Sequence, residues 1–413
     1  MKILPSNRRL LRIRLFFEGA IVGIFTGVIV AALRFLLDEA DIYRPIIFAH
    51  VNSFGRIFFA IGVMILIAAV LSKAVAFDAQ VGGSGIPQIK GILQGQAQMV
   101  KPFRLLAVKF FATVLGIGAG LSLGRAGISV QFGAAVGNFF TKIIYAGKKN
   151  HEAVEGNFLL TAGAGAGLAA IFNAPLAGVI FCIEDLRKRF SQEILIAAMT
   201  AAVIASFVVK IVFGVRPVFE TITPTPLHVP PVITLPDLEM AAAMSAAPLK
   251  FSALFILLGI ICGIVGAFFS KALIFALDVY DGLKIFGVKR FAIPLLMAIP
   301  LGIELPQVLG CGNVLVDEIL ITHLTINLLI ILLAGKILYT LISFGMAAFF
   351  AAVVKAPVTG SILILELTGQ FEHLAGLIVV SGAAFLISDL CGGEPIFSAL
   401  LQRSQNKKLS SKS

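Results

Sequence analysis

Charged residues are scarce in this sequence of 413 residues: Asp, Glu, Lys and Arg together make up 13% of it. Soluble domains carry about 25% of such residues, because water must solvate their surfaces. Hydrophobic residues make up 59%, and the 40 glycines are not counted among them. This composition excludes a soluble enzyme, a disordered chain and a nucleic-acid-binding domain, and it predicts an integral membrane protein.

Residues that bind metals or form disulfides are also few, with four cysteines and five histidines. They stand singly along the chain, without the spacing of a zinc site or of a disulfide framework. No pair of a nucleophile and a base stands out either. We therefore expect no metal, no cofactor and no enzymatic activity.

Basic residues are concentrated at the two ends of the chain. Those before the first apolar run are Lys2, Arg8, Arg9, Arg12 and Arg14, and those that close the chain are Arg403, Lys407, Lys408 and Lys412. By the positive-inside rule, both termini are expected on the cytoplasmic side of the inner or plasma membrane. The first apolar run, at about 15–37, is too long for the core of a signal peptide, so we expect it to be retained.

Apolar stretches recur along almost the whole chain and predict an all-α, multi-pass membrane protein. Several are shorter than the roughly 20 residues that span a bilayer, and several are interrupted by glycines. Inside a membrane, short broken helices are tolerated where their backbone lines an enclosed cavity, so they indicate an internal binding site. The stretches lie at about 15–37, 56–77, 103–121, 126–146, 157–186, 193–213, 250–278, 289–303, 324–345, 346–368 and 372–391.

The two halves of the chain share a motif. Residues 174–178 (APLAG) and 356–360 (APVTG) have Pro and Gly at the same spacing, each followed by a Glu nine residues after the Pro. Chance similarity between apolar helices is the alternative, but hydrophobicity alone does not repeat Pro, Gly and Glu. We therefore predict two related halves with a site at their junction. The expected divisions are a basic N-terminus (1–14), a first repeat (15–214), a Pro-rich connection (215–249), a second repeat (250–402) and a basic tail (403–413).

The second repeat is shorter than the first. Residues 109–113 (KFFAT) resemble 336–340 (KILYT), but the distance from that Lys to the motif Pro is 66 residues in the first half and 21 in the second. About 45 residues are therefore missing, and we place the gap between Gly345 and Met346. Its counterpart in the first half is the glycine-rich segment 116–137.

Two glycine-rich segments, 82–87 (GGSGIP) and 118–131 (GAGLSLGRAGISVQ), each lead into a run that favours a helix. A helix start leaves about four backbone N–H groups without helical partners and carries roughly half a positive charge. Two such starts that meet inside a membrane form an anion site. The alternative is that the glycines only allow close helix packing, which we favour for Gly163, Gly165 and Gly167.

These segments closely resemble the signature segments of the CLC family of chloride channels and chloride/proton exchangers. The resemblance runs from about residue 15 to 402 and rests on 83–87 (GSGIP), on Gly124-Arg125-x-Gly127, and on the APLAG motif with its following Glu184-Asp185. It implies a homodimer in which each subunit has its own anion pathway, built from two repeats of inverted topology with re-entrant helices. The partners it implies are chloride and the lipid bilayer. No cytoplasmic nucleotide-sensing modules are expected.

The resemblance also assigns roles to single residues. Ser84 matches the serine whose hydroxyl contacts the central anion, and a serine there favours chloride over nitrate or fluoride. The helix that follows opens with Gly85, Ile86 and Pro87. The residues that match the backbone donors of the outer anion site are Gly124, Arg125, Gly127 and Ile128.

The inner end of the family's proton route matches Glu184 and Asp185, with Asp185 in place of a glutamate. The alternative is that Asp185 is a solvated acid, paired with Arg187, Lys188 or Arg189.

Three departures separate this chain from the family pattern. Ala126 stands where the family has a gating glutamate, so the carboxylate that blocks the outer anion site and carries protons is missing. Phe397 stands where a tyrosine would donate a hydrogen bond to the anion. A Gly-x-Phe-x-Pro segment is absent and would fall within the 45-residue gap.

We expect chloride transport that is passive and uncoupled from protons. The alternatives are chloride/proton exchange through Asp185 and a second acid, or a transport-inactive relative that acts as a membrane dimerisation partner.

Overall fold

The structure, a computed structural model, describes residues 5–51, 54–97, 99, 101–146, 149–214, 248–283, 287–304, 309, 344–369 and 371–410. Every regular element in these ranges is a helix, which confirms the predicted all-α class. The chain forms two compact units. One comprises residues 1–215, 273–318 and 397–413, and the other comprises 216–272 and 319–396.

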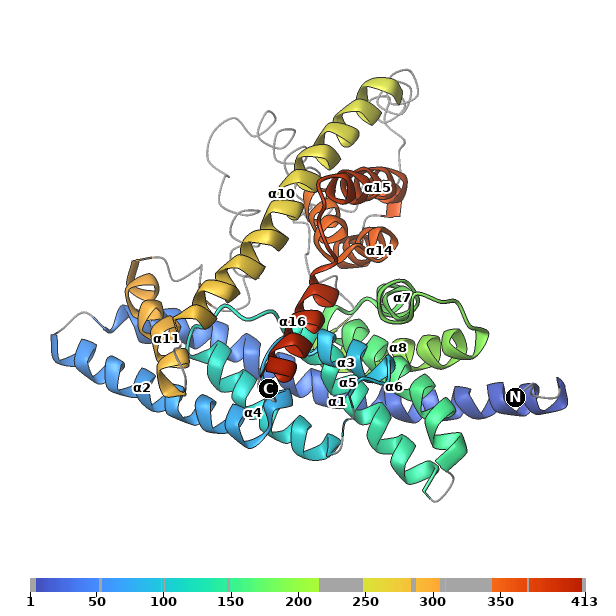
Figure 1. The fold of residues 1–413 in the computed structure, drawn as a ribbon, viewed down its shortest axis with the longest axis horizontal. Coiled ribbons are helices and arrows are strands. Elements are labelled where there is room, and N and C mark those ends of the chain that lie inside the picture. Colours follow the sequence, from blue (N-terminus) through green and yellow to red (C-terminus); the bar gives the residue numbers. More distant parts are fainter. Residues whose placement is uncertain are drawn as a thin grey trace, which may run out of the picture. The chain divides into compact units, whose positions relative to one another are not determined.

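The first unit holds the N-terminal helices and the C-terminal one (Figure 1). Its elements are α1 (Pro5–Ala49), α2 (Phe54–Phe77), η1 (Ala79–Val81), α3 (Ile86–Leu93), α4 (Pro102–Gly118), α5 (Arg125–Ile144), α6 (Lys149–Phe172), α7 (Pro175–Phe181), the π-helical turn η2 (Cys182–Arg187), α8 (Gln192–Phe213), α11 (Val288–Glu304) and nearly all of α16 (Ile396–Ser410).

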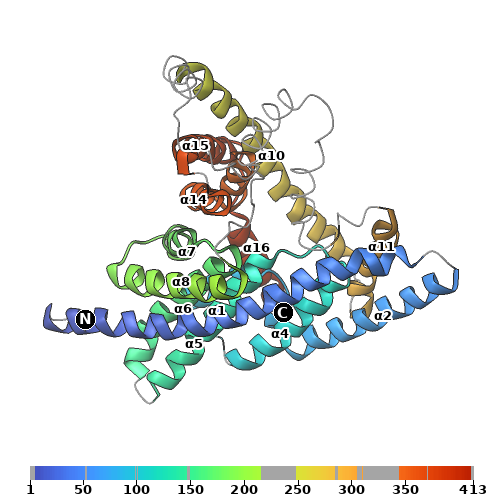
Figure 2. The same cartoon turned by 180° about the vertical axis from the view of Figure 1, so that it is seen from behind.

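The second unit contains most of α10 (Pro248–Gly282), an unlabelled helix Phe344–Val354, α14 (Pro357–Thr368), η4 (Phe371–His373) and α15 (Leu374–Leu390). Helices α14 and α15 lie side by side, as Figures 1 and 2 both show. Glycines let α10 approach its neighbours: a Cβ built on Gly259 would lie 2.8 Å from the Val380 carbonyl oxygen of α15.

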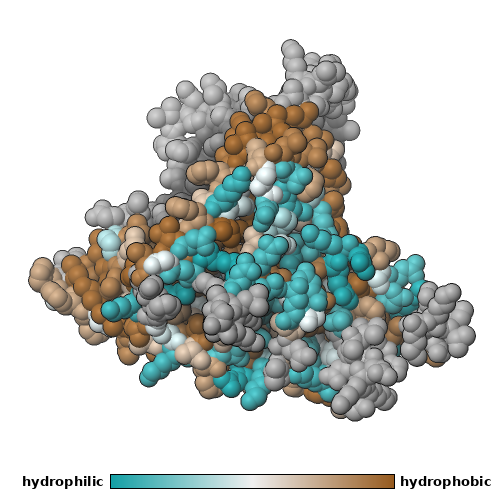
Figure 3. All heavy atoms as spheres, in the orientation of Figure 1, coloured by the Kyte–Doolittle hydropathy of each residue, from teal (hydrophilic) through white to brown (hydrophobic). Residues whose placement is uncertain are grey.

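Four of the described helices are long and apolar enough to cross a bilayer, namely parts or all of α1, α2, α8 and α10 (9–49, 54–77, 192–213 and 255–282). Their large apolar side chains are often exposed, as on α2, where Phe58, Phe59 and Leu66 are more than half exposed. In Figure 3, hydrophobic atoms cover the left side, where Figure 1 places α2. Such a surface is compatible with lipid and not with water, in agreement with the composition.

A seam of small residues joins α1 to α8. A Cβ built on Gly23 would lie 2.6 Å from the Ala201 carbonyl oxygen, and one on Gly27 would lie 2.9 Å from that of Ala205. The same contact recurs one turn earlier, between Gly19 and Ala197. Because lipid supplies no hydrophobic force between helices, close backbone approach of this kind is what holds them together.

The glycines of α6 have the packing role predicted for them. A Cβ on Gly165 would lie 2.7 Å from the Gly178 carbonyl oxygen of α7, and one on Gly167 would lie 2.6 Å from the Ser129 carbonyl carbon of α5. Gly163 meets the backbone of Gly133 in the same way. The prediction that these three glycines allow close helix contact is therefore confirmed.

The two Ala-Pro motifs have the same backbone conformation. Each Pro begins a helix, α7 or α14, and the Ala before it has almost the same dihedral angles in both (φ −125°, ψ 77° and φ −131°, ψ 77°). The preceding residues, Asn173 and Lys355, both have positive φ, 53° and 64°. This conformation is rare for residues other than glycine, so the shared motif is a repeat of structure as well as of sequence.

The Pro of each motif also explains where predicted stretches break. Pro lacks an N–H group and restricts the residue before it, so a helix tends to end before it and a new one to begin at it. The stretch predicted at 157–186 is accordingly divided into α6, α7 and η2, and the one at 346–368 into Phe344–Val354 and α14.

Two predicted features fall largely outside the described residues. These are the Pro-rich connection at 215–249 and the apolar stretch at 324–345. The predicted junction at Gly345 and Met346 lies inside the helix Phe344–Val354. The repeat boundaries and the missing 45 residues stay predictions.

The α5/α6 contact is testable by adding one methyl group. Gly167→Ala is expected to lower the midpoint of thermal unfolding in detergent, because the new Cβ would overlap the Ser129 carbonyl and overpacking costs about 1–3 kcal/mol. Gly62→Ala is the matched control: its Cβ would meet nothing within 4 Å, and Ala is favoured over Gly in a helix by up to about 1 kcal/mol. The midpoint of each variant is measured as the temperature at which half of the monodisperse peak in size-exclusion chromatography is lost after heating. Equal midpoints in the two variants would contradict the tight contact.

Candidate functional site

The starts of α3 and α5 meet, as the sequence predicted for its two glycine-rich segments. Helix α3 follows Gly85 and α5 follows Gly124. A Cβ on Gly85 would lie 2.7 Å from the Gly127 carbonyl oxygen, and one on Gly127 would lie 2.5 Å from that of Ser84. Gly85 also has φ of +103°, which a residue with a side chain rarely adopts. Only glycine fits at either position.

The turn into α3 is held by the side chain of Gln88. Its Oε1 accepts a hydrogen bond from the Gly85 N–H at 3.0 Å, and its Nε2 donates one to the Gly82 carbonyl at 2.8 Å. The side chain thereby fixes the glycine-rich turn and the half-buried Ser84 within it. The sequence did not single out Gln88, although a Gln at the third position of a helix is a known capping signal.

A buried lysine supports the same turn from α4. The ammonium of Lys109 donates to the Gly83 carbonyl at 2.9 Å and also to the side-chain oxygen of Gln131 in α5. Gln131 in turn donates to the Gln80 carbonyl at 3.2 Å. A lysine inside an apolar stretch is costly and marks functional sites, which is the signal that would have identified Lys109.

The first turn of α5 has a cation and no carboxylate. Arg125 is 5% exposed, and its guanidinium lies 3.7 Å from the Asp38 carboxylate of α1. Its carbonyl accepts a hydrogen bond from the Ser129 hydroxyl at 2.9 Å. Ala126 is partly buried and packs against the main core, the largest cluster of buried apolar side chains of the first unit, which includes Val130 and Ala169. Helix α5 has no acidic residue in its first turn. The start of α5 is therefore electropositive, with nothing anionic of its own to occupy it.

Asp185 in η2 is paired with Lys90 in α3. The Lys90 ammonium lies 2.6 Å from Asp185 Oδ1, and each residue is 3% exposed. The interpretation of Asp185 as a solvated acid is therefore wrong, because the side chain is buried and its partner lies 95 residues away in the sequence. Glu184 beside it is only partly buried.

Phe397 lies in the first turn of α16 and packs against the main core, which includes Ile86 and Ile89 of α3. The Lys90 ammonium lies 5.4 Å from the centre of its ring. The structure thus brings residues from α3, α5, η2 and α16 into one connected region. Ser84, Gly85, Ile86 and Pro87 lie at the start of α3, and Gly124, Arg125, Ala126, Gly127 and Ile128 at the start of α5.

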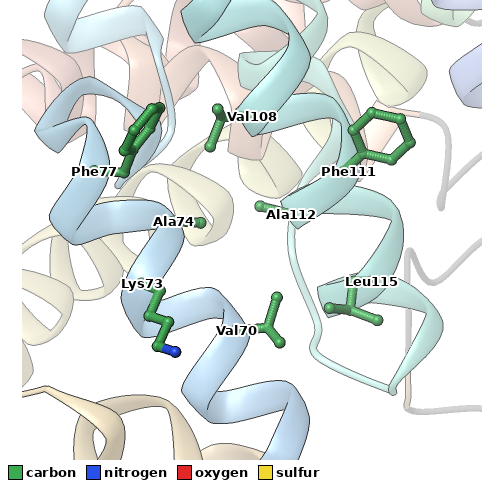
Figure 4. A pocket seen from close by; sticks show the side chains of 8 residues that line it. All are labelled: Val70, Lys73, Ala74, Phe77, Val108, Phe111, Ala112 and Leu115. Atoms are coloured by element: carbon green, nitrogen blue, oxygen red, sulfur yellow. The ribbon is translucent and has the colours of Figure 1, made fainter.

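A groove of about 390 Å³ lies elsewhere, between α2 and α4 (Figure 4). Lys73 is the one charged side chain among its lining residues, and none of the predicted anion-site residues lines it. A surface of this composition does not suit a small anion. The lining residues are Val70, Lys73, Ala74, Phe77, Val108, Phe111, Ala112 and Leu115.

Comparison with known sequences identifies the family of this chain. The family model described as voltage gated chloride channel matches residues 64–346 and 338–389. The two matches overlap at 338–346, the region in which the repeat spacing places the gap. The H(+)/Cl(-) exchange transporter ClcA of Vibrio vulnificus (strain YJ016) is 30% identical over 385 residues, covering 81% of this chain and 77% of that protein. ClcA of Vibrio cholerae serotype O1 (strain M66-2) is 31% identical with the same coverage.

Solved structures show the same fold. A slow cyanobacterial Cl−/H+ antiporter superposes with a TM-score of 0.77 at 24% identity, covering 95% of this chain and 98% of that one. A CLC-type fluoride/proton antiporter superposes with a TM-score of 0.69 at 18% identity, covering 94% and 97%. With the family model matched over more than half of its length and relatives at 30% identity or above, this chain belongs to the voltage-gated chloride channel family, the CLC family.

Proposed function

We propose that this protein carries chloride across a membrane passively, without coupling to protons. Family membership supports anion transport, and the observation that carries the passive mode is Ala126 in the first turn of α5. A carboxylate at this place can occupy an anion site when charged and vacate it when protonated. A methyl group does neither, so chloride meets no competing anion from position 126.

Chloride is the proposed substrate because of the donors that converge at the starts of α3 and α5. Two helix starts approach each other at Gly85 and Gly127, and the half-buried Ser84 adds a hydroxyl. Each helix start favours an anion by up to about 2 kcal/mol when partly buried. The relatives named as chloride/proton exchangers support the same substrate.

The Lys90–Asp185 ion pair bears on the mode of transport, because Asp185 is the carboxylate that the alternative of coupled exchange needs. Its Oδ1 lies 2.6 Å from the Lys90 ammonium and the side chain is buried, so in uncoupled transport the pair has no proton to carry and keeps its contact. The named relatives and neighbours are exchangers or antiporters, so coupled exchange through Asp185 is the competing proposal. A transport-inactive relative that acts as a membrane dimerisation partner is the third candidate, and the gap predicted in the second repeat favours it.

The remaining parts of the proposal concern assembly and location. We propose a homodimer without a cofactor in the inner or plasma membrane, with both termini in the cytoplasm. The basic residues at both ends of the chain support this orientation, and the likeness to CLC proteins supports the dimer.

Simultaneous recording of chloride and proton movement in proteoliposomes tests the passive mode. We expect a chloride gradient to dissipate without proton pumping, and the flux to be nearly independent of external pH between about 5 and 8, because position 126 has no group that titrates there. Stoichiometric uphill proton movement would support coupled exchange instead. No chloride flux from folded protein would support the inactive relative.

Restoring a carboxylate at position 126 gives a second test. Ala126→Glu is expected to slow chloride flux at neutral pH and to make it increase as the pH falls, because protonation neutralises the blocking carboxylate. Ala126→Gln is the matched control: it has the same size but no titratable proton, so its flux should not depend on pH. An Ala126→Glu variant that behaves like Ala126→Gln would remove position 126 from the anion path.

Ser84→Ala tests the hydroxyl at the anion site. We expect the chloride affinity measured by calorimetry to fall by about 1–3 kcal/mol, the contribution of a hydrogen bond to a charged group. Ser206→Ala is the control, because the Ser206 hydroxyl donates to the Ala169 carbonyl and stabilises helix packing without belonging to the site. Unchanged affinity in Ser84→Ala would exclude this hydroxyl from anion binding.

A further inference from the structure

The Lys90–Asp185 ion pair stands where three parts of the candidate site meet. Lys90 belongs to α3, the helix that Ser84 precedes, and Asp185 belongs to η2. The Lys90 ammonium also lies over the ring of Phe397 in α16, at 5.4 Å from its centre. The buried ammonium of Lys90 thus contacts both η2 and α16, and the proposed transport gives Lys90 itself no role.

A buried ion pair is a poor device for stability alone. Removing two charges from water costs several kcal/mol each, and their attraction offsets this only when the remaining polar atoms are also satisfied. Here Asp185 Oδ2 is buried without a hydrogen-bond partner. An apolar pair of similar volume would hold α3 against η2 at least as well, so the charges themselves need a reason.

The position of Lys90 in α3 supplies that reason. Helix α3 has only eight residues, and Lys90 is four residues after Ile86, so its backbone lies about 6 Å along the axis from the first turn. An anion at the start of α3 would therefore be about one helical turn from the backbone of Lys90, a separation over which a charge on this short helix still acts. In a region of low dielectric, such interactions are screened far less than in water.

We propose that Lys90 is the cation that attracts the transported anion toward the inner part of the path, and that Asp185 is its fixed counter-ion instead of a proton carrier. This proposal rests on the proposed chloride transport and names a further residue that determines it. Lys188 and Glu184 are the other charged groups that act on the pair. Because Asp185 partly cancels the charge of Lys90, the anion is attracted without being held too tightly to leave.

The proposal predicts opposite effects from removing the two charges. Asp185→Asn keeps the shape of the side chain and leaves the Lys90 charge uncompensated, so chloride affinity should rise roughly tenfold. Lys90→Gln leaves a buried carboxylate near the path, so affinity should fall by a similar factor. The double variant Lys90→Gln/Asp185→Asn has a neutral pair and should bind chloride within about twofold of the unmodified protein, as should Lys90→Arg.

Calorimetric titration of the full-length protein with sodium chloride, together with thermal unfolding in the same detergent, measures these effects. Affinity changes of opposite sign in the two single variants would support the proposal, because a merely structural pair destabilises in the same direction whichever partner is lost. A fall in affinity in both single variants would overturn it. If Lys90→Gln does not fold, the other two variants still test the proposal. A chloride affinity that rises in Asp185→Asn and returns to its original value in the double variant would support it.

Two further outcomes separate this proposal from the one on which it depends. Asp185→Asn with unchanged chloride affinity but lost proton movement would make Asp185 a proton carrier and overturn the counter-ion role. If the unmodified protein shows no saturable chloride binding and no chloride flux, the proposed function itself fails. If the unmodified protein binds chloride and both single variants bind it with the same affinity, only the proposed role of Lys90 fails.

Discussion

The candidate site depends on one close approach, between the turn at Ser84 and Gly85 and the first turn of α5 at Gly127. Within a bilayer no water is available to satisfy exposed backbone groups, so two helix starts can face each other only if protein atoms hold them in place. Gln88 and Lys109 do this by bonding to the carbonyls of Gly82 and Gly83. The carbonyl oxygens of Gly82 and Gly83 thereby find protein donors, so the glycine-rich turn that precedes α3 is satisfied without water.

The fold class followed from the sequence because lipid permits few alternatives. A chain with 59% hydrophobic residues and little charge must satisfy its backbone internally, and successive apolar stretches then form helices. The breaks in these helices were also predictable where Pro175 and Pro357 mark them. The two helix starts that meet were anticipated from glycines, because glycine records where backbones approach or where φ is positive.

The polar partners of the site were not predictable in the same way. Lys90 reaches Asp185 across 95 residues of sequence, and Lys109 reaches Gln131 on another helix. Long side chains have many rotamers, so their partners are decided by how the helices pack, which local patterns do not specify. The repeat was visible in the sequence through Pro and Gly, but the equivalence of Ser206 and Ser388 was not. Each of these hydroxyls donates a hydrogen bond to a carbonyl of the helix that precedes its Ala-Pro motif, at 3.2 and 2.9 Å.

The glycine seam between α1 and α8 has a consequence for how the two helices align. Its contacts recur every four residues, from Gly19 with Ala197 to Gly27 with Ala205, and both helices run in the same direction. A slide of one helix by four residues, about 6 Å, would bring Gly19 and Gly23 opposite Ala201 and Ala205 and would keep two of the three glycine–alanine contacts. The seam therefore fixes the distance between the helices but not their alignment along the axis. That alignment is selected by contacts that do not repeat, such as the hydrogen bond from Arg12 to Gln192 at the beginning of α8.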